Sequence, residues 1–321
     1  MSSALKYFHK FGGINLMKQY FRAGVLCTAI MQFLTLGKSK TALEILRMSV
    51  AMKIKQKLAK KYKSELEEFD KKWTSNLTHE TNRTIWIFWW QGLENAPNLV
   101  KVCFNSVKKN LGSDWDIIVL TENNYTEYVN FPTHIIEKFK SGVITITHLS
   151  DLLRLELLIK YGGLWLDATV FCSGRGIPIS IIESDFFTFR TQKPGADGKA
   201  TPLSSWLMYA KTNNQLLIAT KKLLYKYWEK NKSMMDYFLL HHFLSIVCDR
   251  NPNITNKIPP FCNSIPHILQ LHLFDEYNET YWNDLKRMTC FHKLTYKLDP
   301  NKCKEKGTFY DILINCQQDT N

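Results

Sequence analysis

The chain has 321 residues, of which 45% are hydrophobic and 13% are aromatic, so it can bury a sizeable core and is not intrinsically disordered. Its 42 Lys and Arg residues outnumber 29 acidic residues, which gives a net charge of +13. This excess favours anionic partners: nucleic acid, an acidic membrane surface or phosphorylated small molecules. The eight cysteines show no CxxC pair and no zinc-finger spacing, so we expect reduced thiols in a cytoplasmic protein.

Residues 1–75 predict a helical N-terminal segment, separate from a domain over residues 80–321. The start of the chain lacks the apolar core of a secretory signal. The best apolar run, Ala23 to Leu36, is shorter than the about 20 residues that a membrane-spanning helix needs. We therefore expect no integral membrane segment.

Residues 38–72 carry eleven Lys or Arg residues and five acidic residues. Apolar side chains recur among them at near-helical spacing, at Leu43, Leu46, Val50, Ile54, Leu58 and Tyr62. Two interpretations remain open. The segment could rest on an anionic leaflet at the inner face of the plasma membrane, or it could pack its apolar face on the domain that follows.

The domain begins with alternating strand and helix patterns. The predicted elements, in chain order, are a strand over Ile85–Trp90, a helix over Pro97–Asn110, a strand over Trp115–Leu120, a helix over Ser150–Tyr161 and a strand over Leu164–Val170. This order predicts an α/β fold of parallel βαβ units, which place ligands at the carboxyl ends of the strands. Further elements are predicted as a strand over Phe186–Arg190, a loop over Thr191–Thr201, and helices over Asn214–Glu229 and Met234–Cys248.

The segment Ser150–Val170 carries the strongest signal for a functional site. Ser150 is a plausible N-cap, which would put Asp151 in the first helical turn. Asp151 and Arg154 lie three residues apart and hence on one face. They either pair with each other and cap the helix, or border a cleft that holds a polar ligand. Asp167 falls near the carboxyl end of the following strand, where a carboxylate faces a ligand or a metal.

These residues, SDLLRLELLIKYGGLWLDAT with IWIFWWQG before them, resemble the capsular polysaccharide synthesis proteins and the wider DXD-containing glycosyltransferases of the family 32 type. The resemblance runs from about Ile85 to about Lys297. It implies a GT-A type, Rossmann-like fold and transfer of a hexose from a nucleotide-sugar donor, with a UDP-sugar favoured. It also implies a retaining mechanism, and a lipid-linked saccharide acceptor in bacterial surface polysaccharide synthesis.

The resemblance also implies roles for individual residues. Trp89 would stack on the nucleotide base, and Asp151 and Arg154 would hold hydroxyls of the donor. Donor binding as a whole is assigned to Trp89, Asp151, Arg154, Gly162, Gly163 and Thr169, and the catalytic carboxylate is Asp167.

The motif departs from the Asp-x-Asp of many relatives, because this chain has Asp167-Ala168-Thr169. A threonine hydroxyl is a poor ligand for Mg²⁺ or Mn²⁺. A divalent cation could still be held by Asp167, the diphosphate, water and His292. Alternatively, Lys293 or Arg190 could replace the ion by binding phosphate directly.

Two further expectations concern other polar and aromatic side chains. One of His241 and His242 could face the cleft, although a structural histidine with its hydrogen bonds satisfied is the favoured interpretation. Trp86, Trp90, Trp206 and Trp228 are predicted to lie in the core. A second functional hypothesis is a basic protein that docks on membrane or nucleic acid and has a degenerate transferase site. Nucleic acid is disfavoured because RNA-binding signatures are missing.

Overall fold

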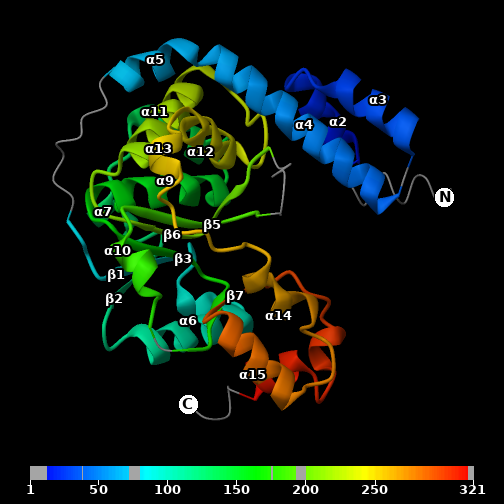
Figure 1. Ribbon diagram of the computed structural model, residues 1–321, viewed down its shortest axis with the longest axis vertical. Coiled ribbons are helices and arrows are strands. Elements are labelled where there is room, and N and C mark those ends of the chain that lie inside the picture. Colours follow the sequence, from blue (N-terminus) through cyan, green and yellow to red (C-terminus); the bar gives the residue numbers. More distant parts are fainter. Residues whose placement is uncertain (1–12, 38, 72–79, 175, 193–199, 317–321) are drawn as a thin grey trace.

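The computed structural model describes residues 13–37, 39–71, 80–174, 176–192 and 200–316 (Figure 1). Its centre is a five-stranded sheet with the order β2-β1-β3-β6-β5. The strands are β1 (Thr84–Phe88), β2 (Asp116–Leu120), β3 (Gly163–Asp167), β5 (Phe186–Arg190) and β6 (Leu203–Ala210). β1 pairs in parallel with β2 and β3, whereas β6 runs antiparallel to both β3 and β5. The predicted α/β class is confirmed, and β1, β2 and β3 pair in parallel as expected for βαβ units.

Helices cover both faces of this sheet (Figure 1). One face carries α9 (Ile146–Lys160), α11 (Gln215–Lys230) and α12 (Leu239–Arg250), and the other carries α6 (Asn98–Leu111) and α10 (Ile179–Glu183). Strand residues alternate between the two layers: Trp86 packs with the first group of helices, and Ile85 and Ile87 pack with the second. Both layers are apolar, so the sheet is buried on its two sides.

The remaining elements are short. They are η1 (Leu93–Asn95), α7 (Tyr125–Tyr128), α8 (Thr133–Lys140), α13 (Pro252–Thr255), η2 (Ile265–His267), α14 (Ile268–Leu271), α15 (Glu279–Met288), η3 (Lys302–Lys304) and η4 (Asp311–Asn315). β4 (Val170–Cys172) and β7 (Phe291–Lys293) form a second, antiparallel sheet of two strands. This small sheet joins the C-terminal segment to the chain just after β3.

The structure corrects the start of the helix before β3. α9 begins at Ile146, four residues before the predicted N-cap, and Thr145 is the cap because its hydroxyl accepts a hydrogen bond from the His148 amide. Ser150 instead donates its hydroxyl hydrogen to the carbonyl of Thr147. Asp151 therefore lies in the second turn, too far from the helix end to act as a charged first-turn residue.

Strand boundaries also differ from the prediction. The expected strand Leu164–Val170 is two strands, because the chain turns at Ala168-Thr169 and enters β4. β6 was not predicted at all, although its eight residues are continuously buried between Pro202 and Lys211. The predicted helix from Met234 begins only at Leu239. Part of the predicted loop Thr191–Thr201 lies outside the described residues.

Within the described part of residues 1–75, the helices are α2 (Gly13–Arg22), α3 (Leu26–Leu36), α4 (Lys40–Lys61) and α5 (Lys63–Lys71). The apolar stripe of α4 is buried, since Leu46, Val50, Ile54 and Leu58 are at most 9% exposed. Just after it, the ring of Tyr62 meets Phe243 of α12 edge-on with the ring centroids 5.3 Å apart. The packing interpretation is confirmed for α4 and Tyr62, whose apolar side chains belong to the same core cluster as α12.

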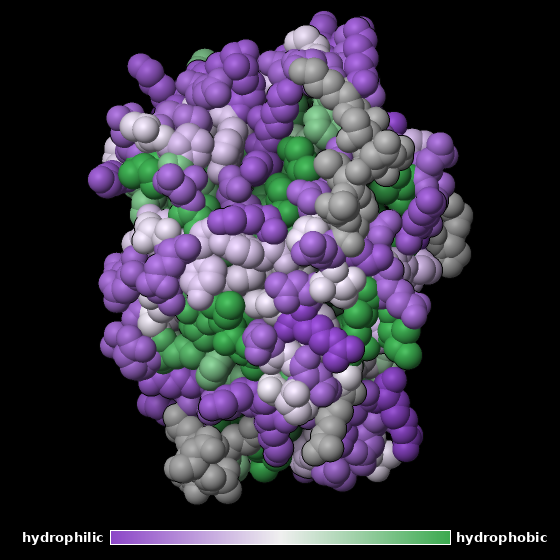
Figure 2. Space-filling view, turned by 90° about the vertical axis from the view of Figure 1, so that its left-hand side faces the viewer, coloured by the Kyte–Doolittle hydropathy of each residue, from purple (hydrophilic) through white to green (hydrophobic). Residues whose placement is uncertain are grey.

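The surface of the molecule differs between its two sides. The side shown in Figure 2 is mostly hydrophilic, with hydrophobic residues in separate patches. α2 and α3 lie on the other side in Figure 1 and expose several large apolar side chains. No helix in the described ranges combines the length and the hydrophobicity needed to cross a bilayer. All eight cysteines are free.

His292 of β7 is buried beneath the small sheet. Its side chain is 1% exposed, its Nε2 lies 2.8 Å from the Ser173 hydroxyl, and its ring centroid lies 5.2 Å from that of Trp282. Burial lowers the pKa of His292 to about 3, because the charged imidazolium loses its hydration there. The fold therefore holds this histidine neutral.

The buried face of α4 predicts a stability effect. Ile54→Ala should lower the free energy of unfolding by about 2–5 kcal/mol, because it leaves a cavity in the core cluster that α4 shares with α12. Ile54 is 0% exposed, whereas Ile45 of the same helix is 42% exposed, so Ile45→Ala is the matched control. Chemical denaturation measures both variants. Equal losses would show that α4 is not packed as described.

His292 predicts a dependence of stability on pH. Its pKa is lower in the folded chain than the ordinary 6.5, so the unfolded chain gains a proton first as the pH falls. The free energy of unfolding should therefore fall as the pH drops below 6.5, by about 2 kcal/mol between pH 7.5 and pH 5. His292→Gln should flatten this slope, whatever its effect on stability at pH 7.5. Identical slopes in wild type and variant would contradict the prediction.

Candidate functional site

A pocket of about 370 Å³ opens at the carboxyl end of β3, where α9, β6 and β7 meet. Its volume lies within the about 300–1,000 Å³ of typical small-molecule sites. Its wall includes charged and polar side chains from segments distant in the sequence, namely Asp151, Arg154, Asp167, Ser205, His241 and Lys293. The predicted cleft at the strand ends therefore exists.

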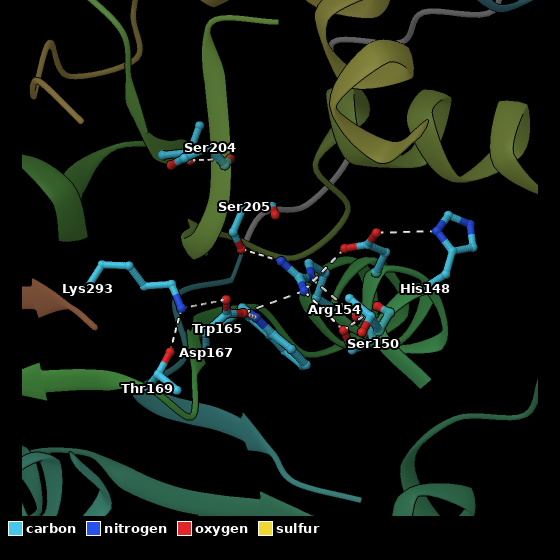
Figure 3. A network of polar contacts seen from close by, with 12 residues as sticks. His148, Ser150, Arg154, Trp165, Asp167, Thr169, Ser204, Ser205 and Lys293 are labelled. Carbon is cyan, nitrogen blue, oxygen red and sulfur yellow. Dashed lines mark hydrogen bonds and ion pairs between the residues drawn. The ribbon is translucent and has the colours of Figure 1, made fainter. Parts of the chain in front are cut away.

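Arg154 is the centre of the polar network in this pocket (Figure 3). Its side chain is 4% exposed, and its Nη2 lies 3.2 Å from Asp151 Oδ1 and 3.5 Å from Asp167 Oδ1. Its Nη1 donates to the carbonyl of Ser205, and its guanidinium lies 4.8 Å from the centre of the Trp165 ring. A buried charge is tolerated only when it is paired, and Arg154 is paired on both sides. Arg154 therefore forms ion pairs with both Asp151 and Asp167.

A buried histidine, His148, contacts Asp151. His148 Nδ1 lies 3.4 Å from Asp151 Oδ2, and His148 Nε2 accepts a hydrogen bond of 2.9 Å from the indole of Trp228. Since Nε2 is an acceptor, the proton sits on Nδ1 and faces the carboxylate. Burial opposes the ionised form of Asp151, but Arg154 and His148 outweigh it and lower the pKa of this carboxyl. Asp151 is a carboxylate at neutral pH.

Asp167 lies between two cations at the mouth of this network. Its Oδ1 accepts a hydrogen bond of 3.1 Å from the Trp165 indole, and its Oδ2 lies 3.3 Å from Lys293 Nζ. Lys293 also donates to the hydroxyl of Thr169 (Figure 3). The side chain of Asp167 remains 29% exposed, so part of the carboxylate faces the pocket.

One histidine of the predicted pair faces the pocket. His241 is part of the pocket wall, and burial lowers its pKa to about 4, so that it is neutral at pH 7. Its Nδ1 is buried without a hydrogen-bond partner in the described chain. His242 is 1% exposed, and its Nε2 lies 3.5 Å from Asp236 Oδ1. The less favoured of the two interpretations therefore holds for His241, which faces the cleft, whereas His242 does not line the pocket.

Gly162 and Gly163, which the resemblance assigns to donor binding, do not line this pocket. They lie at the amino end of β3, and Asp167 is at its carboxyl end. Their φ angles are +68° and +93°, and a Cβ on Gly163 would lie 2.4 Å from the carbonyl oxygen of Thr84. The carbonyl of Gly162 accepts from the Trp86 indole at 2.9 Å. These glycines are needed for the tight turn from α9 into β3.

Trp89 lies just after β1 and is not part of the pocket wall. The centre of its ring lies 5.3 Å from that of Tyr296, and its indole nitrogen is buried without a hydrogen-bond partner in the described residues. Among the predicted core tryptophans, Trp86, Trp206 and Trp228 are buried, whereas Trp90 is half-buried. Trp206 has a second role, because it also lines the pocket.

The two alternatives to Lys293 lie elsewhere. His292 follows the strand alternation of β7 and points away from Asp167, toward Ser173 and Trp282. The predicted metal pair of Asp167 and His292 is therefore not assembled. Arg190 ends β5 and does not line the pocket. Of the three predicted candidates, Lys293, one residue from His292, is the one whose side chain reaches Asp167.

Sequence reasoning missed the contributions of β6 and of the segment before α12. Ser205 supplies a carbonyl to Arg154, and the Trp206 indole donates a hydrogen bond of 2.8 Å to Asn263. Tyr237 and Phe238 form half-exposed walls, with 56% and 51% of their surfaces accessible. The run LSSWLMYA, bounded by Pro202 and Lys211, was a usable strand signal.

Curated relatives match parts of this chain. O-glycosyltransferase PaGT of Phomopsis amygdali is 29% identical over 184 residues, which are 52% of this chain and 43% of that protein. O-glycosyltransferase braB of Annulohypoxylon truncatum is 32% identical over 99 residues, 28% of this chain and 24% of that protein. The chain thus spans less than half the length of these relatives.

A solved structure, PaToxG Glycosyltransferase, is similar at a TM-score of 0.35 and 14% identity, over 84% of this chain and 98% of that chain. This likeness is too loose for comparing individual elements. A family model described as capsular polysaccharide synthesis protein matches residues 38–313, which is most of the chain and includes the whole pocket. The chain therefore belongs to the capsular polysaccharide synthesis protein family.

Proposed function

We propose that this protein is a glycosyltransferase that moves a hexose from a nucleotide-sugar donor to a saccharide acceptor. The observation that supports this most directly is the cluster of Asp151, Arg154, Asp167 and Lys293 around one pocket at a strand end. Its family, and relatives described as O-glycosyltransferases, support the same activity.

The reaction explains why both signs of charge are needed. When the bond from the anomeric carbon to the diphosphate breaks, the diphosphate takes the electron pair and the sugar becomes cation-like. Lys293 is placed to face the growing negative charge, and Asp167 to face the sugar. Asp151 and Arg154 supply an acceptor and a donor for hydroxyls of the bound nucleotide-sugar. Neutral His241 adds one more polar atom to the wall.

The donor, the stereochemistry and the acceptor are proposed from the resemblance of the sequence to its family. We propose a UDP-sugar donor, retention at the anomeric carbon, and a lipid-linked acceptor in the synthesis of a bacterial capsule or other surface polysaccharide. Trp89, with its unpaired indole nitrogen beside Tyr296, remains the candidate for stacking on the base. Proton NMR of the first-formed product distinguishes retention from inversion.

The surface of α2 and α3 supports contact with an anionic membrane on the cytoplasmic side. Residues 13–61 contain ten Lys or Arg residues and one acidic residue, Glu44. Phe21 is 73% exposed, Met31 60% and Leu34 75%. Exposed apolar side chains with basic neighbours are typical of helices that lie in a lipid interface. Because the stripe of α4 is buried, we assign this contact to α2 and α3, which would bring the pocket near a lipid-linked acceptor.

Asp167→Asn should reduce hydrolysis or transfer of UDP-sugars by about 100- to 1,000-fold, because the amide cannot stabilise positive charge on the sugar. Asp284→Asn is the matched control, since Asp284 is 54% exposed and lies on α15. Release of nucleoside diphosphate measures turnover, and circular dichroism checks the fold. Wild-type turnover in a folded Asp167→Asn protein would remove Asp167 from the reaction.

Replacing Phe21 and Leu34 together by glutamate should weaken binding to phosphatidylglycerol vesicles by about tenfold or more, since each side chain loses its apolar burial in lipid. The control is Leu271→Glu on α14, where the side chain is 76% exposed but far from this surface in Figure 1. Vesicle co-sedimentation measures both. Unchanged binding of the double variant would rule out α2 and α3 as the contact.

A further inference from the structure

The oxygens of Asp167 are already occupied by protein donors. Oδ1 lies 3.1 Å from the Trp165 indole nitrogen and 3.5 Å from Arg154 Nη2, and Oδ2 lies 3.3 Å from Lys293 Nζ. Mg²⁺ binds carboxylate oxygens at about 2.0–2.1 Å and demands near-octahedral geometry. An ion on Oδ2 would lie against the ammonium of Lys293, and the two positive charges would repel each other.

The other positions needed for a divalent cation are also unsuitable. Thr169 presents a neutral hydroxyl, and that hydroxyl already accepts a hydrogen bond from Lys293. His292 is directed to Ser173 on the other side of β7. Within the ranges that the structure describes, His, Cys, Asp and Glu residues form no group of three or more that could hold a metal ion. The residues present do not fit Mg²⁺ or Mn²⁺.

Lys293 supplies the charge that such an ion would bring. A carboxylate at position 169 together with a divalent cation would carry a net charge of +1. A neutral Thr169 together with the ammonium of Lys293 carries the same +1. Because Thr169 is neutral, Asp167 is the one motif carboxylate that pairs with Lys293. A phosphate can therefore approach the ammonium of Lys293 without meeting a second carboxylate.

The fold holds Lys293 at this position. Antiparallel pairing of β4 and β7 sets Lys293 opposite Val170, one residue after Thr169. The Leu294 amide donates a hydrogen bond of 2.9 Å to the carbonyl of Thr169, which fixes the backbone on the other side of Lys293. The side chain is 19% exposed and lines the pocket. Its ammonium is thus confined before any ligand arrives.

We infer that Lys293 takes the place of the divalent cation, so that this protein binds nucleoside diphosphate and transfers sugar without Mg²⁺ or Mn²⁺. The inference rests on the proposed function. In the reaction, the bond from the anomeric carbon to the diphosphate oxygen breaks, and its electron pair stays on that oxygen beside Lys293. The acceptor hydroxyl oxygen forms the new bond to the anomeric carbon, and its proton leaves with the nucleoside diphosphate.

Titration calorimetry of UDP with the full chain tests this inference, in EDTA and in Mn²⁺. The wild-type dissociation constant should agree within about twofold between the two buffers. Lys293→Met should weaken UDP binding about 10- to 100-fold, as expected for a lost hydrogen bond to a charged group, and Mn²⁺ should not restore it. Lys293→Arg should retain most of the affinity. Lys297→Met is the control, since Lys297 is exposed on the same segment.

A rebuilt ion site provides the reverse test. The double variant Thr169→Asp, Lys293→Met restores a second carboxylate and removes the ammonium, so its UDP binding should become dependent on Mn²⁺. Electron paramagnetic resonance of Mn²⁺ without nucleotide should detect binding by the double variant but not by the wild type. This readout needs no activity, and thermal melting confirms that each variant is folded.

Two results would overturn the inference while leaving the proposed function intact: loss of wild-type UDP binding or sugar turnover in EDTA with recovery in Mn²⁺, or unchanged UDP affinity of Lys293→Met. Absence of binding to UDP and GDP in both buffers would instead overturn the proposed function, and this inference with it.

Discussion

The buried guanidinium of Arg154 is the interaction on which the candidate site depends. It joins α9 to β3 and β6, because it contacts Asp151, Asp167 and the carbonyl of Ser205. A charge at 4% exposure needs such partners, since desolvation without them would cost more than the fold can supply. The same requirement fixes where both carboxylates point. The positions of Asp151 and Asp167 at the pocket are therefore fixed by their ion pairs with buried Arg154, before any ligand binds.

Asp167 pairs with two cations that lie on different sides of it. Toward the core it balances Arg154, and toward the pocket it balances Lys293. The local charge at the turn after β3 is therefore close to neutral without an ion, even though the whole chain carries +13. The large basic excess lies elsewhere, much of it on α2 and α4. This separation lets a basic protein have both a balanced pocket and a positively charged N-terminal surface.

The N-terminal helices illustrate the limit of periodicity as a signal. The spacing of Leu46, Val50, Ile54 and Leu58 predicts one apolar face, and that face exists. Periodicity does not say what covers the face, since lipid and protein both favour it. The structure shows that α3 and α12 both pack against α4. The large apolar side chains that remain exposed, such as Phe21 and Leu34, lie on shorter helices whose pattern is less regular.

The sequence alone determined the α/β class and the order of β1, α6, β2, α9 and β3, because local hydrophobic periodicity is encoded within short segments. The grouping of Asp151, Arg154 and Asp167 in one site followed from the resemblance to a family, since spacing alone left a self-paired helix cap open. The resemblance assigned Gly162 and Gly163 to donor binding, but they form the tight turn before β3, at the end of the strand opposite to Asp167. The sequence left His292, Lys293 and Arg190 as equal candidates. Only the tertiary structure chose Lys293, because antiparallel pairing of β4 and β7 brings it to Thr169 from 124 positions away and strand alternation turns His292 to the other side.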